Sequence, residues 1–337
     1  MEFIQRFIEE MPKAELHLHI EGTLEPEMML ALAHRNKVKL PYDTIEDIKK
    51  AYQFSCLQDF LDVYYLGMSV LLTRQDFYDL TFAYLEKMAR QNVVHVEIFF
   101  DPQGHTDRGV SFDTVLSGIT DALDQAKRDF KISSKLIMCF LRHLPEEQAF
   151  ETLQSACKCK EHIYAVGLDS SENGHPPSKF QRVFEEARKE GFVAVAHAGE
   201  EGPPGYIAEA LDLLQVQRID HGNKILQDDS LVQRVAKTGM AMTVCPLSNL
   251  RLNVVDDMKN HPLRQMLQNG LCPTINSDDP SYFGGYMTEN YLAVQSSLDL
   301  SLEEIKQLGR NSFAGSFLTD AEKQTALQRF DDFSTKL

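Results

Sequence analysis

Short apolar runs rich in β-branched residues alternate with helical segments along most of this chain. We predict eight strands, at residues 13–20, 93–100, 134–141, 164–169, 192–198, 217–221, 241–247 and 272–277. Helical stretches separate the later strands, at residues 177–190, 204–214, 231–238 and 262–269. Strands that alternate with helices eight times predict an α/β fold of the (β/α)8 TIM barrel type.

A doubly wound parallel sheet is the alternative fold for the same alternation. That fold predicts a glycine-rich phosphate turn after the first strand and ligands at a single crevice. Here the first strand ends in HLHIEGT (17–23), and reactive residues follow at least four strands. The C-terminal face of a barrel collects residues from many strands in this way, so the pattern favours the barrel.

Residues 24–90 form a segment that is too long for one crossover helix. It contains helical stretches at 26–36, 57–72 and 74–91. An insertion after the first strand of a barrel is expected to cover the C-terminal face, either as a lid or as a structural packing layer. We see no linker, repeat or low-complexity segment, so we expect residues 1–337 to form a single barrel domain with this helical insertion.

Composition narrows the class of protein. The 337 residues are 43% hydrophobic and 25% charged, as in ordinary soluble globular proteins. A net charge of −16 argues against binding to nucleic acid or to an anionic membrane. The segment MEFIQRFIEE (1–10) does not resemble a signal peptide, and we expect the six cysteines to be free thiols. We therefore expect a cytoplasmic protein with a small-molecule partner, and leave its oligomeric state open.

Four residues at strand ends have the chemistry of metal ligands. His17 and His19 are two positions apart on the first strand, so they share one face. His197 ends the fifth strand, and Asp278 follows the eighth. Three imidazoles and one carboxylate suit zinc or iron with one position left open for water. We refer to these four residues as the ligand candidates.

Three further residues in the same motifs are acid/base candidates: Glu200, His221 and Asp279. A turn after His197 would let Glu200 reach over the metal site. His221 could instead be a core histidine paired with Asp220. We expect the adjacent carboxylates of residues 278 and 279 to diverge, so that one binds metal and the other faces substrate.

The end of the fourth strand argues for a single metal. Two-metal barrels often use a modified lysine there as a bridging ligand, and GLDSS (167–171) contains no lysine. Near the ends of the second and third strands, Glu97 and the pair Arg142-His143 are candidates for a supporting ion pair. We expect no catalytic role for them.

Six motifs resemble the adenosine/adenine deaminase family of the amidohydrolase superfamily. They are PKAELHLHIEGTLEP (12–26), GLDSSE (167–172), HAGEEGP (197–203), RIDHG (218–222), CPLSN (245–249) and NSDDPSYFGGY (276–286). The resemblance covers nearly the whole chain. In their order and in their residues, the motifs resemble those of the adenine deaminases more than those of the adenosine deaminases.

The resemblance implies a barrel in which the ligand candidates hold zinc, with iron as the alternative metal. It implies that Glu200 donates a proton to the purine and that His221 lies beside the water. It also implies that Asp279 contacts the purine and that the backbone around Gly167 approaches it. The implied reaction is hydrolysis of adenine to hypoxanthine and ammonia, a step of purine salvage.

Two alternatives stay open at this point. The first is deamination of adenosine or of an N6-substituted adenine, and the second is a catalytically silent barrel that binds a purine. One departure from the adenosine deaminases bears on this choice, because Glu21 stands where they usually have an aspartate that contacts ribose. The longer side chain would enter the volume of the sugar or turn to a different partner. Ser277, in place of their usual threonine, is a milder change.

Overall fold

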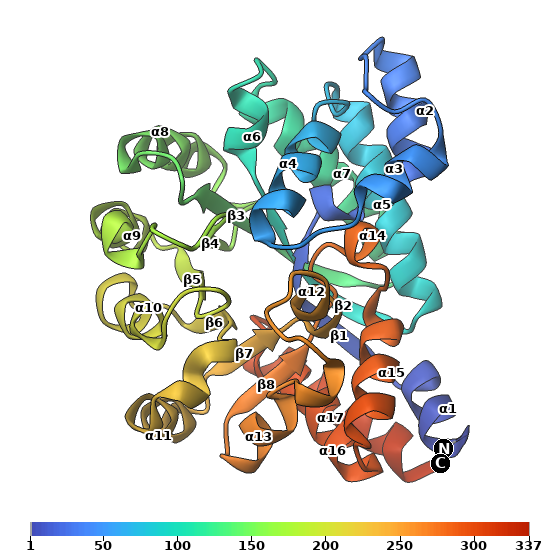
Figure 1. Cartoon of the computed structure of the whole chain (residues 1–337), viewed down its shortest axis with the longest axis vertical. Coiled ribbons are helices and arrows are strands. Elements are labelled where there is room, and N and C mark those ends of the chain that lie inside the picture. The colour runs from blue at the N-terminus through green and yellow to red at the C-terminus, as the bar shows by residue number, and fades with distance from the viewer. Residues whose placement is uncertain (1, 337) are drawn as a thin grey trace.

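Eight parallel strands form the barrel in the computed structural model, which describes residues 2–336 (Figure 1). Each strand pairs with the next one along the chain, in the order β1 to β8. Their bounds are β1 Lys13–His19, β2 Val93–Phe100, β3 Ser133–Leu141, β4 Ala165–Asp169, β5 Val193–Ala198, β6 Arg218–His221, β7 Ala241–Val244 and β8 Cys272–Ile275. The predicted (β/α)8 barrel is confirmed.

The barrel closes between its last and first strands at residues just beyond β8. The Asp278 backbone N–H donates to the carbonyl oxygen of His17 at 3.1 Å, and the His19 N–H donates to the carbonyl oxygen of Asp278 at 3.0 Å. The closing hydrogen bonds therefore use three of the four ligand candidates. The hydrogen bonds that close the barrel thus also bring His17, His19 and Asp278 together.

The outer layer consists of helices that connect successive strands. They are α5 Arg74–Arg90, α7 Phe112–Asp129, α8 Glu146–Ala156, α9 Gln181–Lys189, α10 Pro204–Glu209, α11 Asp229–Thr238, α13 Leu263–Gln268 and α16 Leu302–Ala314. Their first turns are stabilised locally, because Thr73, Ser111, Asp228 and Ser301 accept N-terminal backbone N–H groups of α5, α7, α11 and α16. Short polar residues before apolar segments thus set where the helices begin.

The remaining helices lie at the ends of the barrel or across its mouth. They are α1 Glu2–Glu10, α2 Pro26–Asn36, α3 Ile45–Ala51, α4 Leu57–Met68, α6 Pro102–Thr106, α12 Pro246–Arg251, α14 Pro280–Phe283, α15 Met287–Leu298 and α17 Asp320–Lys336. The two termini lie close together (Figure 1), since Phe7 of α1 contacts Phe330 of α17 at a ring distance of 6.5 Å. No helix of residues 2–336 is both long enough and apolar enough to cross a membrane.

The observed elements differ from the predicted ones mainly at their ends. Strand β7 stops at Val244, three residues before the predicted end, because Pro246 begins helix α12. The stretch predicted as helix 57–72 ends at Met68. The six cysteines are free thiols, as predicted.

Candidate active site

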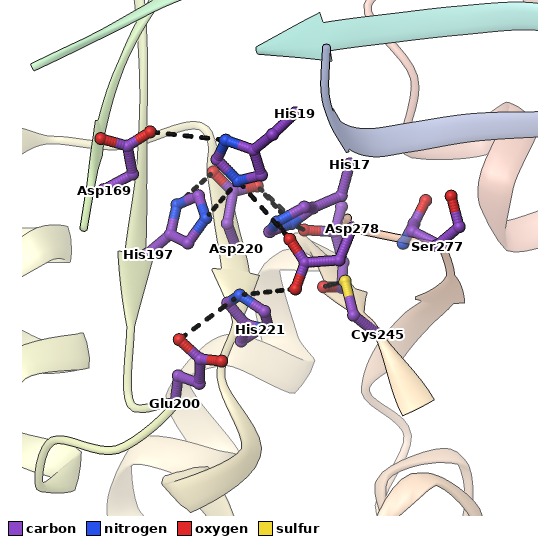
Figure 2. A network of polar contacts seen from close by, with 12 residues as sticks. His17, His19, Asp169, His197, Glu200, Asp220, His221, Cys245, Ser277 and Asp278 are labelled. Carbon is purple, nitrogen blue, oxygen red and sulfur yellow. Dashed lines mark hydrogen bonds and ion pairs between the residues drawn. The ribbon is translucent and has the colours of Figure 1, made fainter. Parts of the chain in front are cut away.

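The ligand candidates meet at the C-terminal end of the barrel (Figure 2). The Nε2 atoms of His17 and His19 lie 3.3 and 3.5 Å from Oδ1 of Asp278. His19 Nε2 also lies 3.1 Å from Nε2 of His197. Residues from β1, β5 and the segment after β8 are thus brought into one cluster, although they are up to 261 positions apart in sequence.

Four residues here, with His221 in place of His19, have the donor atoms that a divalent metal requires. One nitrogen or oxygen from each of His17, His197, His221 and Asp278 lies within 4.8 Å of the other three, and all four residues are buried. Nε2 of His17 is buried without a hydrogen-bond partner, while its Nδ1 is bonded to Thr243 Oγ1 at 2.8 Å. An unpaired buried nitrogen is costly unless another group binds it. The residues therefore fit a metal.

Glu200 and His221 lie beside the second oxygen of Asp278 (Figure 2). His221 Nε2 is 3.8 Å from Asp278 Oδ2 and 3.6 Å from Glu200 Oε2. Burial, followed by the charge of Asp278, raises the pKa of Glu200 well above its ordinary value. Burial lowers the pKa of His221 to about 3. A carboxyl group whose protonated form is favoured by burial thus lies next to an imidazole whose neutral form is favoured.

The carboxylates of Asp278 and Asp279 do not follow the alternation expected of a strand end. Asp278 has a φ of 64°, a left-handed conformation that breaks the strand geometry. Oxygens of both carboxylates lie within 4.8 Å of each other and of a His19 nitrogen. Burial and the charge of Asp278 raise the pKa of Asp279 well above its ordinary value. Burial therefore favours the protonated form of Asp279 as well.

Glu172 holds the loop that carries Glu200, and sequence reasoning did not find this role. Its Oε1 accepts the backbone N–H of Gly199 at 2.7 Å. Its Oε2 accepts the N–H groups of Glu200, Glu201 and Gly202 at 3.0, 2.9 and 2.8 Å. Four backbone donors on one buried carboxylate fix the position of the loop relative to the ligand candidates. The only sequence signal was the place of this acid in the motif GLDSSE.

Gly167, whose backbone is expected to approach a bound purine, lies within β4 and is not among the residues that line the cavity. A Cβ added at this position would lie 2.5 Å from Sγ of Cys139, so Gly167 faces the packed interior of the barrel. The residues of this segment that line the cavity are Asp169 and Ser170, at the end of β4. Asp169 Oδ2 lies 3.5 Å from Nδ1 of His19. The open space thus begins at the end of this strand.

A cavity opens over the cluster. Its floor is polar and consists of residues at the strand ends, including Asp169, His197 and Asp279. Its other wall is apolar and aromatic, and is formed by helix α4 through Leu57, Phe60, Leu61, Tyr64 and Tyr65. The polar floor and the apolar wall suit a flat polar heterocycle.

Glu21 is buried and turned toward protein partners. Its Oε1 accepts the backbone N–H of Asp101 at 3.1 Å and the Nε2 of His105 at 2.9 Å. Arg108 in turn donates to Nδ1 of His105 at 2.8 Å. Because Nδ1 accepts this bond, Nε2 carries the ring proton and donates it to Glu21. The Glu21 carboxylate is thus held by the Asp101 backbone and by His105, whose ring is in turn fixed by Arg108.

The supporting ion pair predicted for Glu97 has a different partner. Glu97 pairs with Arg218 inside the barrel, and both side chains are fully buried. Arg142 donates instead to the carbonyl oxygens of His197 and His175, at 2.7 and 2.8 Å. The prediction was wrong because Glu97 lies halfway along β2, whereas Arg142 lies beyond the end of β3.

Comparison with known proteins gives consistent matches over the full length. The family model described as adenosine deaminase matches residues 12–333. An adenine deaminase of Acinetobacter baylyi is 60% identical, with 96% of this chain and 98% of the relative covered. The crystal structure of adenine deaminase from Arthrobacter aurescens superposes with a TM-score of 0.95 at 48% identity, covering 96% and 99% of the two chains. An amidohydrolase from Burkholderia ambifaria with bound zinc superposes with a TM-score of 0.90 at 27% identity, covering 98% and 94%.

Proposed function

The chain belongs to the adenosine deaminase family, and from that membership we propose that it hydrolyses adenine to hypoxanthine and ammonia. The observation that carries the proposal is the full-length similarity to relatives named adenine deaminase. The cavity supports it independently, since Glu200 and Asp279, whose pKa values are raised by burial, lie next to a cluster of histidines and an aspartate. We further propose a single domain at residues 1–337, with 24–90 covering the site, and a cytoplasmic location.

We propose that His17, His19, His197 and Asp278 hold one zinc ion per chain, with iron as the alternative. The unpartnered buried Nε2 of His17 and the zinc-bound amidohydrolase of the same fold support this assignment. When bound, such a metal acts as a Lewis acid that makes hydroxide available near neutral pH.

The protein side chains supply the proton transfers of the reaction. Hydrolysis adds the oxygen of water to C6, and the exocyclic amine leaves as ammonia, so the ring and the amine must both gain protons. Protonated Glu200 donates to N1 of the purine, which draws electrons away from C6. Neutral His221 orients the attacking water and accepts a proton from it. Protonated Asp279 donates a hydrogen bond to N7.

The free base is proposed as the substrate rather than the nucleoside because Glu21 is already engaged. Its Oε1 accepts hydrogen bonds from both His105 and the Asp101 backbone. Its Oε2 is buried, and Glu21 is not among the residues that line the cavity, so a ribose hydroxyl could not reach this carboxylate without a shift of the side chain. A lost charge-assisted hydrogen bond costs roughly 1.5–3 kcal/mol. We therefore expect kcat/KM for adenine to exceed that for adenosine by at least about 100-fold.

The test is the rate of ammonia release from adenine, adenosine and N6-methyladenine by the purified protein. Fast release from adenine, with about one equivalent of metal per chain by elemental analysis, is the expected result. Comparable kcat/KM values for adenine and adenosine would remove the free-base assignment. Two equivalents of metal, or full activity after complete metal removal, would overturn the mononuclear centre.

A further inference from the structure

Asp220 lies beneath the metal cluster, between two of the ligand candidates (Figure 2). Its Oδ1 is 3.9 Å from Nδ1 of His17, and its Oδ2 is 3.9 Å from Nδ1 of His197. The side chain is fully buried. Oδ2 of Asp220 and Nδ1 of His197 both lack a hydrogen-bond partner, and they face each other across this gap. One carboxylate thus lies next to the inner nitrogens of two histidines.

Thr243 connects this carboxylate to His17 and determines where the ring proton lies. The Thr243 hydroxyl donates to Asp220 Oδ1 at 2.9 Å, and this uses its only hydrogen. The hydroxyl oxygen also lies 2.8 Å from Nδ1 of His17, so in this second bond it must accept. His17 therefore carries its proton on Nδ1, and the lone pair of Nε2 points toward Asp278.

Arg218 fixes Asp220 from below. Its Nε donates to Asp220 Oδ1 at 3.0 Å, and its Nη1 pairs with Oε2 of Glu97. All three side chains are fully buried. The guanidinium stacks against the ring of Phe317 at 4.8 Å, which restricts its movement. Because Arg218 supplies a positive charge between two carboxylates, Asp220 is kept as an acceptor toward the threonine and the two histidines.

We propose that Asp220 and Thr243 are positioning residues that set the ring tautomers of His17 and His197, with Arg218 and Glu97 as their anchor. This inference rests on the proposed metal centre. A histidine that donates its inner N–H to a fixed acceptor presents the other nitrogen to a metal in one orientation. The same carboxylate serves both rings, so it couples β1 and β5 through β6.

A merely structural role for these residues predicts something different. Removal of the Thr243 hydroxyl would then lower the stability of the fold without a specific effect on metal. Thr274 provides a matched comparison, because it pairs with Thr243 in the register of β7 and β8 and is also fully buried. Its hydroxyl accepts from Asn276 Nδ2 at 3.0 Å and is outside the metal cluster.

In the experiment, holoenzymes loaded with one equivalent of zinc are mixed with an excess of a coloured chelator. The rate and the extent of zinc transfer to the chelator are measured for each variant. For Thr243→Val and Asp220→Asn we expect zinc affinity to fall by about 10–100-fold, as for other residues that orient metal ligands. Thr243→Ser, which keeps the hydroxyl, should restore the wild-type value. Thr274→Val should release zinc at the wild-type rate, even if its thermal midpoint falls as far as that of Thr243→Val.

A second measurement reads the tautomer directly. In protein labelled with ¹⁵N-histidine and stripped of metal, the ring nitrogens of His17 should show a proton on Nδ1, and Thr243→Val should lose this preference. Wild-type zinc affinity in Thr243→Val, equal weakening in Thr274→Val, or an Nε2 proton on His17 would each overturn the inference. Failure of the wild-type protein to bind zinc would overturn the proposed metal centre instead, so the two failures are distinguishable.

Discussion

The interior of this barrel has two halves that are built on different principles. On one side, Phe99, Ile137, Cys139, Ala165 and Val195, from strands β2 to β5, form a buried apolar cluster. Next to it, Glu97, Arg218, Asp220, Thr243 and His17 form a buried chain of ion pairs and hydrogen bonds, and Phe99 lies at the boundary, in contact with His17 and Arg218. We call these the apolar half and the ionic half.

The difference between the halves follows from what each supports. Apolar side chains of similar volume replace one another at modest cost, because dispersion contacts have no direction. Each group of the ionic half depends on a specific partner, and burying such ions gives little or no net stability compared with apolar packing. The ionic half is thus expensive, and it lies directly under the metal cluster. What it contributes is orientation of the histidines.

The largest expected effect is on catalysis, directly above the ionic half. Glu200→Gln keeps the shape of the side chain but removes the carboxyl proton, so we expect kcat to fall by roughly 10²–10⁴-fold. Metal content should be unchanged. The control is Glu201→Gln, the next residue of the same loop, which should keep kcat within about threefold, as expected away from the reacting groups. If Glu200→Gln is active within about tenfold, Glu200 is not the proton donor.

The next largest effect concerns stability within the ionic half. Arg218→Met leaves two buried carboxylates without their cation, and removal of one partner of a buried pair costs about 3–5 kcal/mol. Urea unfolding of the metal-loaded protein measures the change. Adding Glu97→Gln and Asp220→Asn should recover part of the loss, because the uncompensated charges are then gone. Equal stability of the single and triple variants would show that charge is not the cause.

A smaller effect is expected from pH. Burial and the charge of Asp278 raise the pKa of Glu200, so its protonated form, the proposed proton donor, persists to higher pH than that of an ordinary glutamate. As pH rises through this pKa, the donor is lost, and kcat should fall about tenfold per pH unit on the alkaline side. The pH profile of Glu201→Gln should keep this alkaline decline, and that of Glu200→Gln should lack it. An unchanged profile in Glu200→Gln would assign the decline to another group.

The sequence was sufficient for the barrel and for the cluster at its mouth. Short apolar runs rich in β-branched residues predict strands, and residues after parallel strands must meet at one face. His17, His19, His197 and Asp278 follow that rule, so their meeting could be predicted from the motifs alone. Strand ends were less certain, as at Val244, because local turn chemistry decides them.

Roles that depend on contacts between residues far apart in the sequence could not be predicted in this way. Asp220 looked like a possible partner of its neighbour His221, yet its contacts are with Thr243, Arg218 and the rings of two other histidines. Such partners are chosen by the register between strands, which no local pattern records. The left-handed backbone conformation of Asp278 likewise accompanies the closure of the barrel, and its neighbours in sequence do not predict it.

The smallest effect is expected in the apolar half, and it tests the comparison most directly. Ile137→Val removes one methylene from the apolar cluster and should cost about 0.5–1.5 kcal/mol in the free energy of unfolding. Zinc release and kcat should stay at wild-type values, since Ile137 has no place in the chain of hydrogen bonds. Combined with Thr243→Val, its cost should add within roughly 0.5 kcal/mol, because the two sites share no partner. Faster zinc release from Ile137→Val would mean that apolar packing also orients the ligands, and the division into two halves would fail.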